Sequence, residues 1–389
     1  MPEAFKNHFN EAVITHLASQ LWLNYPVFDQ RAFIKQACAG LDSLELKARS
    51  NQICDALLAH MPRDFAQASE IIVNSLAPPG DDQTIVFEQS NKGTEDSPQG
   101  IAGWIMMPVS DYITQACLQS IDTPKHPNFA LGLEALKACT QRYSAEFAIR
   151  PFLRDFSEAT LTVLGAWVYD ENAHVRRLVS EGTRPFLPWG LRLHHLADDP
   201  SLILPLLTHL RDDKSEYVRR SVANNLNDIA KPHPNLVARI ARQWWQDGDK
   251  NRTRLIKHAC RTLLKNGHPG ALALFGYPPA SLDKVSLALS AKQVAIGDLL
   301  EIVLSLSNPL KQMQNLLVDY AVYHQKANGT LSPKVFKWRS FELLPNERKT
   351  FCKAHSFKLV TTRKYYPGEH RIEILINGES QCEQVFELI

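Results

Sequence analysis

The chain has 389 residues, of which 44% are hydrophobic and 22% charged, with a formal net charge of +2. This composition is that of a folded globular protein and excludes a wholly disordered chain. No apolar run reaches the roughly 18 residues that a membrane helix needs, and we expect no secretory signal at the N-terminus. The seven cysteines are scattered without a CxxC pair. They argue against a zinc module or a disulfide framework and favour a reducing cytoplasm.

The charge is unevenly distributed along the chain. Residues 1–127 contain 8 Lys and Arg against 15 Asp and Glu, residues 128–280 contain 21 against 15, and residues 281–389 contain 14 against 11. The basic excess begins where the chain becomes repetitive, which suggests a polyanionic partner. The alternative is a solvated repeat surface, because helical arrays are often rich in charge.

The N-terminal region is predicted to be helical. Residues 1–76 carry a one-faced apolar stripe at helical spacing, formed by Phe9, Val13, Ile14 and Leu17. Residues 77–100, with Pro, Gly and several acidic residues, predict a long loop. Helical periodicity resumes after Pro127 and continues to about Leu274.

The second helical region contains an internal repeat. The segments 173–181, 216–224 and 253–261 align at spacings of 43 and 37 residues. Such spacings are typical of two-helix HEAT-like repeats, which stack into a solenoid to bury their apolar faces. A basic residue recurs at one register and a polar residue follows one turn later, in the pairs Arg177 and Glu181, Arg220 and Asn224, and Lys257 and Arg261. Because residues four apart share a helix face, we expect one basic row on the stacked helices; solvated outer-face charges are the alternative.

From Tyr277 the hydrophobic period changes from helix to strand. Alternating runs such as 302–306 and 372–376, separated by turn signals, predict about seven short strands. This pattern favours an immunoglobulin-like β-sandwich, in which Cys352 and Cys382 need not form a disulfide. The predicted fold class is therefore mostly α: a HEAT-like helical solenoid over residues 1–280, acidic over residues 1–127 and basic over residues 128–280, followed by an all-β sandwich over residues 281–389.

Common catalytic motifs are absent. The sequence contains no GxxxxGK[ST], GxGxxG, HExxH or GxSxG pattern, so nucleotide hydrolysis, dinucleotide chemistry, zinc proteolysis and α/β-hydrolase chemistry lose support. The remaining constellation is the segment 141–153, in which Glu146 and Arg150 lie four residues apart. From spacing alone, a plain helix salt bridge explains this pair better than a functional site does.

Several segments, taken in order along the chain, resemble the AlkC branch of the alkylpurine DNA glycosylases. Two C-terminal segments, residues 332–347 and 363–379, resemble the immunoglobulin-like domain found in some members of that branch. The resemblance covers nearly the whole chain and rests on AEFAIRPFL (145–153), HVRRLVSEGTRPFLPW (174–189), YVRRSVANNLNDIAK (217–231), KHACRTLLKNGHPGALALFG (257–276), SPKVFKWRSFELLPNE (332–347) and RKYYPGEHRIEILINGE (363–379).

The resemblance implies an activity as well as a fold. It implies a HEAT-like domain that grips duplex DNA and cleaves the N-glycosidic bond of cationic N3-alkylated bases, 3-methyladenine and 3-methylcytosine, without drawing the lesion into a deep pocket. Glu146 matches the catalytic carboxylate of the sister AlkD branch. The two aromatic positions of that branch are matched by Arg142 and Asn224, so its aromatic contacts are not transferred. The pair of adjacent basic residues that precedes the next repeat in the sister branch is matched here by Arg176 and Arg177.

The candidate site residues follow from the resemblance and from the basic row. A carboxylate beside the sugar would stabilise an oxocarbenium-like charge and orient water, since an alkylated cationic base leaves without protonation. Glu146 is the predicted catalytic residue. Glu158 and Glu181 are reserves, for which a surface ion pair is the alternative. For Trp189, packing between domains is the alternative to a DNA contact. The predicted DNA contacts are Arg150, Arg176, Arg177, Arg184, Trp189, Arg219, Arg220, Asn224, Lys257 and Arg261.

Three functions are compatible with these features. The first is a monofunctional DNA N-glycosylase, a monomer that needs no cofactor or metal and acts in base excision repair in a bacterial cytoplasm, with duplex DNA as its partner and no membrane. The second is a non-catalytic HEAT-repeat module that binds distorted DNA or RNA through the same basic row. The third is a protein-interaction scaffold, which predicts no salt-dependent affinity for DNA.

Overall fold

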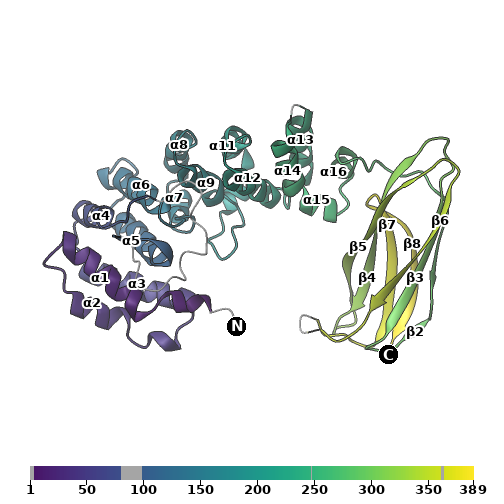
Figure 1. The fold of residues 1–389 in the computed structure, drawn as a ribbon, viewed down its shortest axis with the longest axis horizontal. Coiled ribbons are helices and arrows are strands. Elements are labelled where there is room, and N and C mark those ends of the chain that lie inside the picture. Colours follow the sequence, from purple (N-terminus) through teal and green to yellow (C-terminus); the bar gives the residue numbers. More distant parts are fainter. Residues whose placement is uncertain (1–3, 80–98, 247, 361–362) are drawn as a thin grey trace. The chain divides into compact units, whose positions relative to one another are not determined.

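The structure is a computed structural model that describes residues 4–79, 99–246, 248–360 and 363–389. Most of the long loop predicted for residues 77–100 lies outside the described residues. Within the described ranges, no helix is both long and apolar enough to cross a membrane. The architecture confirms the predicted fold class, a helical repeat array followed by a β-sandwich (Figure 1).

The chain divides into two compact units. One contains residues 1–232 and 249–259, and the other contains residues 233–248 and 260–389. The predicted domain boundary at residue 280 falls between the last helix, α16 (Pro269–Leu274), and the first strand, β1 (Asp283–Leu289). This boundary stays a prediction, because the compact units divide the chain at other points.

The first unit begins with helices whose apolar faces form the core. Asn10 caps the first helix by accepting a hydrogen bond from the backbone N–H of Val13, and Phe9, Ile14 and Leu17 are fully buried as the apolar stripe predicts. Short 3-10 helices lie at Phe5–His8, Leu41–Ser43, Gly103–Ile105 and Pro200–Leu202. The α-helices of this region are α1 (Glu11–Asn24), α2 (Gln30–Ala37), α3 (Leu46–His60), α4 (Phe65–Asn74), α5 (Met106–Gln119) and α6 (Pro127–Thr140).

The predicted repeat segments form neighbouring helices. The helices α9 and α12 contain the first two aligned segments, and α14 contains residues 253–259 of the third. Helix α12 packs against both α9 and α14, while α8 and α11 also pack against α9 (Figure 1). This stacking is the solenoid arrangement that the spacing predicts. The helices of this region are α7 (Ile149–Asp155), α8 (Ser157–Trp167), α9 (Ala173–Gly182), α10 (His194–Asp198), α11 (Leu204–Leu210), α12 (Glu216–Ile229) and α14 (Lys250–Ala259).

The third repeat departs from the predicted register. Helix α14 ends at Ala259, and a new helix, α15 (Arg261–Lys265), begins after Cys260. Arg261 therefore does not lie one helical turn beyond Lys257 on the same helix, as the sequence alignment predicts. It belongs to the second compact unit, together with α13 (Pro234–Gln246) and α16.

The second unit ends in a sandwich of two sheets. The three-stranded sheet has the order β1-β3-β6 and the five-stranded sheet has the order β2-β8-β7-β4-β5. The predicted inward-facing residues are buried in its core, with Ile302, Leu304 and Leu306 on β3 and Ile374 on β7 fully inaccessible. Cys352 and Cys382 are free thiols. The strands after β1 are β2 (Gln293–Val294), β3 (Leu299–Ser307), β4 (Gln314–Gln325), β5 (Leu331–Leu343), β6 (Arg348–Ser356), β7 (Gly368–Ile376) and β8 (Glu379–Leu388).

One region of the sandwich core is polar rather than apolar. His324, His355 and His370 are all at least nine-tenths buried. Tyr320 Oη and His355 Nδ1 form a hydrogen bond of 3.0 Å, and Arg363 donates one of 2.6 Å to His324 Nε2. Burial, together with the charge of Arg363, lowers the pKa of His324 to about 3 and that of His355 to about 4. These imidazoles are therefore neutral at neutral pH.

Candidate functional site

Glu146 lies in a turn that precedes α7 and is not on a helix. The carboxylate is 16% exposed, and both of its polar contacts involve the same oxygen, Oε2. Ser144 Oγ donates a hydrogen bond of 2.8 Å to Oε2, and Arg177 Nη1 forms a short ion pair with it. The helix salt bridge between Glu146 and Arg150 that spacing allows is not formed, because the two residues do not share a helix. Among the residues that the structure describes, Oε1 has no polar partner.

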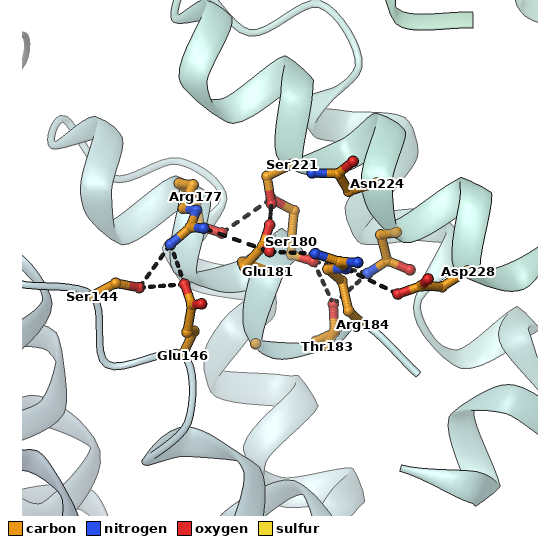
Figure 2. Close-up of polar contacts among 12 residues, drawn as sticks. Ser144, Glu146, Arg177, Ser180, Glu181, Thr183, Arg184, Ser221, Asn224 and Asp228 are labelled. Carbon is orange, nitrogen blue, oxygen red and sulfur yellow. Dashed lines mark hydrogen bonds and ion pairs between the residues drawn. The ribbon is translucent and has the colours of Figure 1, made fainter. Parts of the chain in front are cut away.

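Arg177 links Glu146 to a second carboxylate. It extends from α9 between Glu146 and Glu181, with Nη2 at 3.5 Å from Glu181 Oε1 (Figure 2). Its guanidinium also lies over the ring of Tyr217, 4.9 Å from the ring centroid. Burial disfavours the charged form, but the carboxylates of Glu146 and Glu181 outweigh it and raise the pKa of Arg177 above its ordinary value. Arg177 is thus a permanent cation whose charge is directed at Glu146.

A buried ionic network lies behind this pair. Arg184 donates to Glu181 Oε1 at 2.6 Å and to Asp228 Oδ2 at 2.9 Å, and Ser221 donates to Glu181 Oε2 at 2.6 Å (Figure 2). Burial alone would raise the pKa of Glu181, but Arg177 and Arg184 lower it below its ordinary value. Glu181 is only 4% exposed. It therefore acts as an ionised structural group, which argues against its reserve role as the catalytic carboxylate.

Two tyrosines near Glu146 were missed by the sequence reasoning. Burial raises the pKa of both Tyr143 and Tyr217, and the charge of Glu146 raises both further. Tyr143 also contacts Trp104, with ring centroids 5.4 Å apart. The aromatic positions of the sister branch are matched in sequence by Arg142 and Asn224, yet the structure brings these tyrosines to the carboxylate. The available signal was their nearness in sequence: Tyr143 precedes Glu146 by three residues, and Tyr217 precedes the second basic doublet.

Three of the predicted DNA contacts are buried. Arg150 has no exposed surface and donates to the carbonyls of Gly182 at 2.7 Å and Leu191 at 2.5 Å. Arg176 is 6% exposed and binds both oxygens of Asp213, and Arg184 is 8% exposed within its network. These guanidiniums are enclosed and bind protein groups, although Nη2 of Arg150 is buried without a hydrogen-bond partner in the described residues. We therefore correct their assignment from DNA contacts to structural residues.

The two residues of each basic doublet have different surroundings. In the first position, Arg176 and Arg219 each donate through Nη1 to two carbonyls of the loop before their helix. In the second position, Arg177 holds Glu146, whereas Arg220 is exposed and makes no polar contact with any described residue. Only the second arginine of each doublet, Arg177 or Arg220, is therefore placed to form the basic row that the sequence predicts.

The remaining predicted residues lie on or near the surface. Asn224 is half-buried and hydrogen-bonds to His258 at 2.9 Å, while Lys257 and Arg261 are exposed. Glu158 is exposed in the first turn of α8, and no contact joins it to the Glu146 network in the described residues. The structure thus brings Glu146, Arg177, Glu181 and Arg184 together and leaves Glu158 outside.

Trp189 is the most exposed aromatic residue of the predicted site. It is 81% exposed and has a backbone φ of 63°, a conformation that costs a non-glycine residue roughly 1–3 kcal/mol. The buried Arg150 braces its loop by binding Leu191, and the space at Gly190 is filled by Leu187 and Arg150. The loop therefore presents a large aromatic side chain on a braced backbone.

The described residues contain no group of three or more His, Cys, Asp or Glu side chains that could hold a metal ion. The candidate site thus consists of protein groups alone: a fixed carboxylate with one open oxygen, a cation that holds it, two tyrosines and an exposed tryptophan.

Comparisons with known proteins cover the whole chain. Residues 283–389 match a family model described as the C-terminal Ig-like domain of the uncharacterised protein YhaZ. The uncharacterized protein YhaZ of Bacillus subtilis (strain 168) is 37% identical over 386 residues, covering 98% of this chain and 99% of that protein. The solved structure of the Pseudomonas fluorescens alkylpurine DNA glycosylase AlkC, bound to DNA with an abasic-site analog, is 34% identical, with a TM-score of 0.79 and 100% coverage of both chains.

Proposed function

Because the chain belongs to the AlkC-type family of alkylpurine DNA glycosylases, we propose that it removes alkylated bases from duplex DNA, as a first step of base excision repair. Its substrates are cationic N3-alkylated bases, 3-methyladenine and 3-methylcytosine. A base that already carries a positive charge leaves without protonation, so the site needs no acid with a raised pKa. The protein acts as a monofunctional hydrolase and as a monomer, in the cytoplasm and without a cofactor.

The observation that carries this proposal is the way Glu146 is held. Ser144 and Arg177 both bind Oε2, so the carboxylate has a defined orientation while Oε1 stays available. Breaking the glycosidic bond leaves positive charge on the deoxyribose. A fixed carboxylate stabilises that charge without reorganising, and Oε1 accepts a hydrogen bond from the attacking water. Arg177 is then a positioning residue rather than a phosphate contact.

The surroundings of Glu146 suit a cationic substrate that stays near the surface. Tyr143 provides a π-system, whose face attracts positive charge, whereas the ring of Tyr217 is already covered by the guanidinium of Arg177. Trp189 is exposed and braced, as expected of a side chain that stacks on a base of a distorted duplex. The proposed mode of action therefore needs no deep pocket and no flipped base.

The test of the activity is direct. The full-length protein is incubated with methylated genomic DNA, and the released bases are identified by mass spectrometry. We expect free 3-methyladenine and 3-methylcytosine. Protein that shifts the methylated DNA in a gel but releases no base would contradict the proposal and favour the non-catalytic binding module. Protein that shows no salt-dependent affinity for DNA would favour the interaction scaffold.

A further inference from the structure

Tyr217 connects the first two repeats at the candidate site. It lies in the first turn of α12, at the repeat position that His174 occupies in α9. The guanidinium carbon of Arg177 lies 4.9 Å from the centroid of its ring, and the ring of His174 meets it at 65° with centroids 5.5 Å apart. Tyr217 is 38% exposed, and its hydroxyl makes no hydrogen bond with any residue that the structure describes. It therefore contacts Arg177 through its ring and not through its hydroxyl.

Arg177 is held by polar groups and by this ring together. Nη1 donates to Ser144 Oγ at 2.7 Å and to Glu146, and Nη2 lies 3.5 Å from Glu181 (Figure 2). Its Nε is buried and has no hydrogen-bond partner in the described part of the chain. A guanidinium is attracted to the face of an aromatic ring as well as to carboxylates. The two terminal nitrogens are thus occupied by oxygens, and the ring of Tyr217 covers the group.

The next repeat lacks this arrangement. Arg220 occupies the position of Arg177 in α12, and the position of Tyr217 is taken in α14 by Arg254, a second cation. Both arginines are exposed and line the same cleft, and neither makes a hydrogen bond or an ion pair with any described residue. An aromatic cover therefore accompanies the arginine that holds Glu146 and is missing from the arginine that holds no carboxylate.

Bound duplex DNA would compete with Glu146 for Arg177. The duplex carries one negative charge for about every 1.7 Å of its axis, and a guanidinium binds a phosphate through two parallel hydrogen bonds. The side chain of Arg177 is 15% exposed, so it borders the surface at which DNA would lie. If Arg177 turned to a phosphate, Ser144 alone would remain on Glu146 and the carboxylate would lose its fixed orientation.

We propose that Tyr217 is a positioning residue that keeps Arg177 on Glu146 while duplex DNA is bound. The proposal rests on the proposed function, which brings a polyanion to this site. The ring attracts the guanidinium without neutralising it, so the full charge of Arg177 stays directed at Glu146. The ring also covers one side of the guanidinium against phosphate oxygens. Tyr217 acts through Arg177 and needs no contact with the substrate.

The test measures two properties of the full-length protein. The first is single-turnover base release at saturating enzyme. The second is affinity for a duplex with one stable abasic analog from 50 to 200 mM salt, where each phosphate contact contributes about 0.9 to the steepness of log K against log salt. We expect Tyr217→Leu to slow release by about 10-fold, the effect of losing one cation–π contact, and to steepen the salt dependence by about 0.9, because Arg177 then binds a phosphate.

Three further variants assign the effect. Tyr217→Phe keeps the ring and should restore most of the rate and the parental salt dependence. Tyr169→Leu removes a tyrosine that is 72% exposed outside the site and should match the parent in both properties. The double variant R177Q/Y217L should show the parental salt dependence, since the additional phosphate contact belongs to Arg177. Tyr217→Gln replaces Tyr217→Leu in the test if the latter melts below the assay temperature.

The remaining outcomes would overturn the proposal. Tyr217→Leu with the parental rate and salt dependence would show that the ring does not hold Arg177. Slower release with an unchanged salt dependence would show that the ring does not protect Arg177 from phosphates. A steeper salt dependence in R177Q/Y217L would assign the additional contact to another cation. A parent that releases no base would contradict the proposed function, whereas the comparison of salt dependences would still decide the role of Tyr217.

Discussion

The helices α9 and α12 carry the same repeat motif but form different sites. In both, the first arginine of the doublet fixes the preceding loop by donating to its carbonyls. The second arginine is held by Glu146 in α9 and is open to solvent in α12. The repeat therefore sets the direction of the side chain, while a residue from outside the repeat decides whether it positions a carboxylate or remains available to an anion.

The largest expected effect concerns the buried network of α9. Replacing Arg184 by Gln leaves the buried carboxylates of Glu181 and Asp228 without their shared cation. Breaking a buried ion pair from one side costs about 3–5 kcal/mol, and we expect a loss near the lower end, because Arg177 and Lys231 remain. Urea unfolding measures it.

The control for this prediction is Arg154→Gln. Arg154 pairs with Asp155 at a side-chain exposure of 54%, and exposed pairs contribute about 0–1 kcal/mol. Equal losses of stability in the two variants would show that the network of α9 is no more important to the fold than a surface pair.

The next prediction concerns Arg177 and Arg220, the second arginines of the two doublets, which we expect to have different functions. Arg177→Gln removes the cation that orients Glu146, and we expect base release at saturating enzyme to slow by about 100-fold, the usual result of losing one preorganised charge contact. Arg220→Gln should instead weaken DNA affinity more than it slows base release. Single-turnover kinetics and binding titrations distinguish these patterns. Identical profiles for the two variants would break the comparison between α9 and α12.

A smaller effect is expected at the exposed end of the α9 site. Trp189→Ala should leave the unfolding free energy close to that of the parent, because the side chain is 81% exposed. Loss of one aromatic stacking contact with a base costs about 1–3 kcal/mol of affinity. Binding titrations with a lesion-containing duplex measure it, and Trp189→Phe should restore most of the affinity. A large loss of stability would indicate that Trp189 packs within the protein.

The pH dependence of stability should differ between the two units. The pKa of Glu181 is lowered in the folded state. The ionised side chain therefore stabilises the fold above the pKa of an unfolded glutamate, about 4.3, and this stabilisation is lost as the pH falls below that value. His324 and His355 also have lowered pKa values, of about 3 and 4. The sandwich is therefore most stable above about pH 6.5, where both histidines are neutral in the folded and unfolded states, and its stability declines as the pH falls toward those values.

The sandwich should therefore lose stability at a higher pH than the α9 network. The histidines are surrounded by cations, since Arg363 and Lys334 both disfavour a protonated His324 or His355. Urea unfolding between pH 7 and pH 4, followed by near-UV circular dichroism, measures the decline. His324→Gln should flatten it between pH 6.5 and pH 5, whereas Glu181→Gln should flatten it only below about pH 4.5.

The sequence predicted the fold better than the site. Hydrophobic period sets which residues are buried, so the stacked repeats and the inner strand faces at Ile302 and Ile374 followed from spacing. The register of Arg261 did not follow from spacing, because α14 ends at Ala259 and Arg261 begins the next helix. Successive residues on a helix point in directions about 100° apart. Both arginines of one doublet therefore could not face the same row, and this argument from geometry was available from the sequence.

The setting of Glu146 could not be derived from spacing. Its four-residue distance from Arg150 is typical of a helix pair, yet Glu146 lies in a turn and its partner, Arg177, is 31 residues away. The resemblance to a known family singled out Glu146 as the candidate carboxylate, but only the coordinates place Ser144, Tyr143 and Tyr217 around it. Contacts between distant segments depend on tertiary packing, which local periodicity does not encode.

The most direct test of the account is the rate of base release by Glu146→Gln. Single-turnover release of 3-methyladenine from a duplex is compared among the parent, Glu146→Gln, and two controls at exposed glutamates, Glu134→Gln and Glu158→Gln. We predict a loss of at least about 100-fold in Glu146→Gln alone, with DNA still bound and the melting temperature retained. Release at the parental rate by Glu146→Gln, or an equal loss in Glu158→Gln, would contradict the claim that this carboxylate acts beside the deoxyribose.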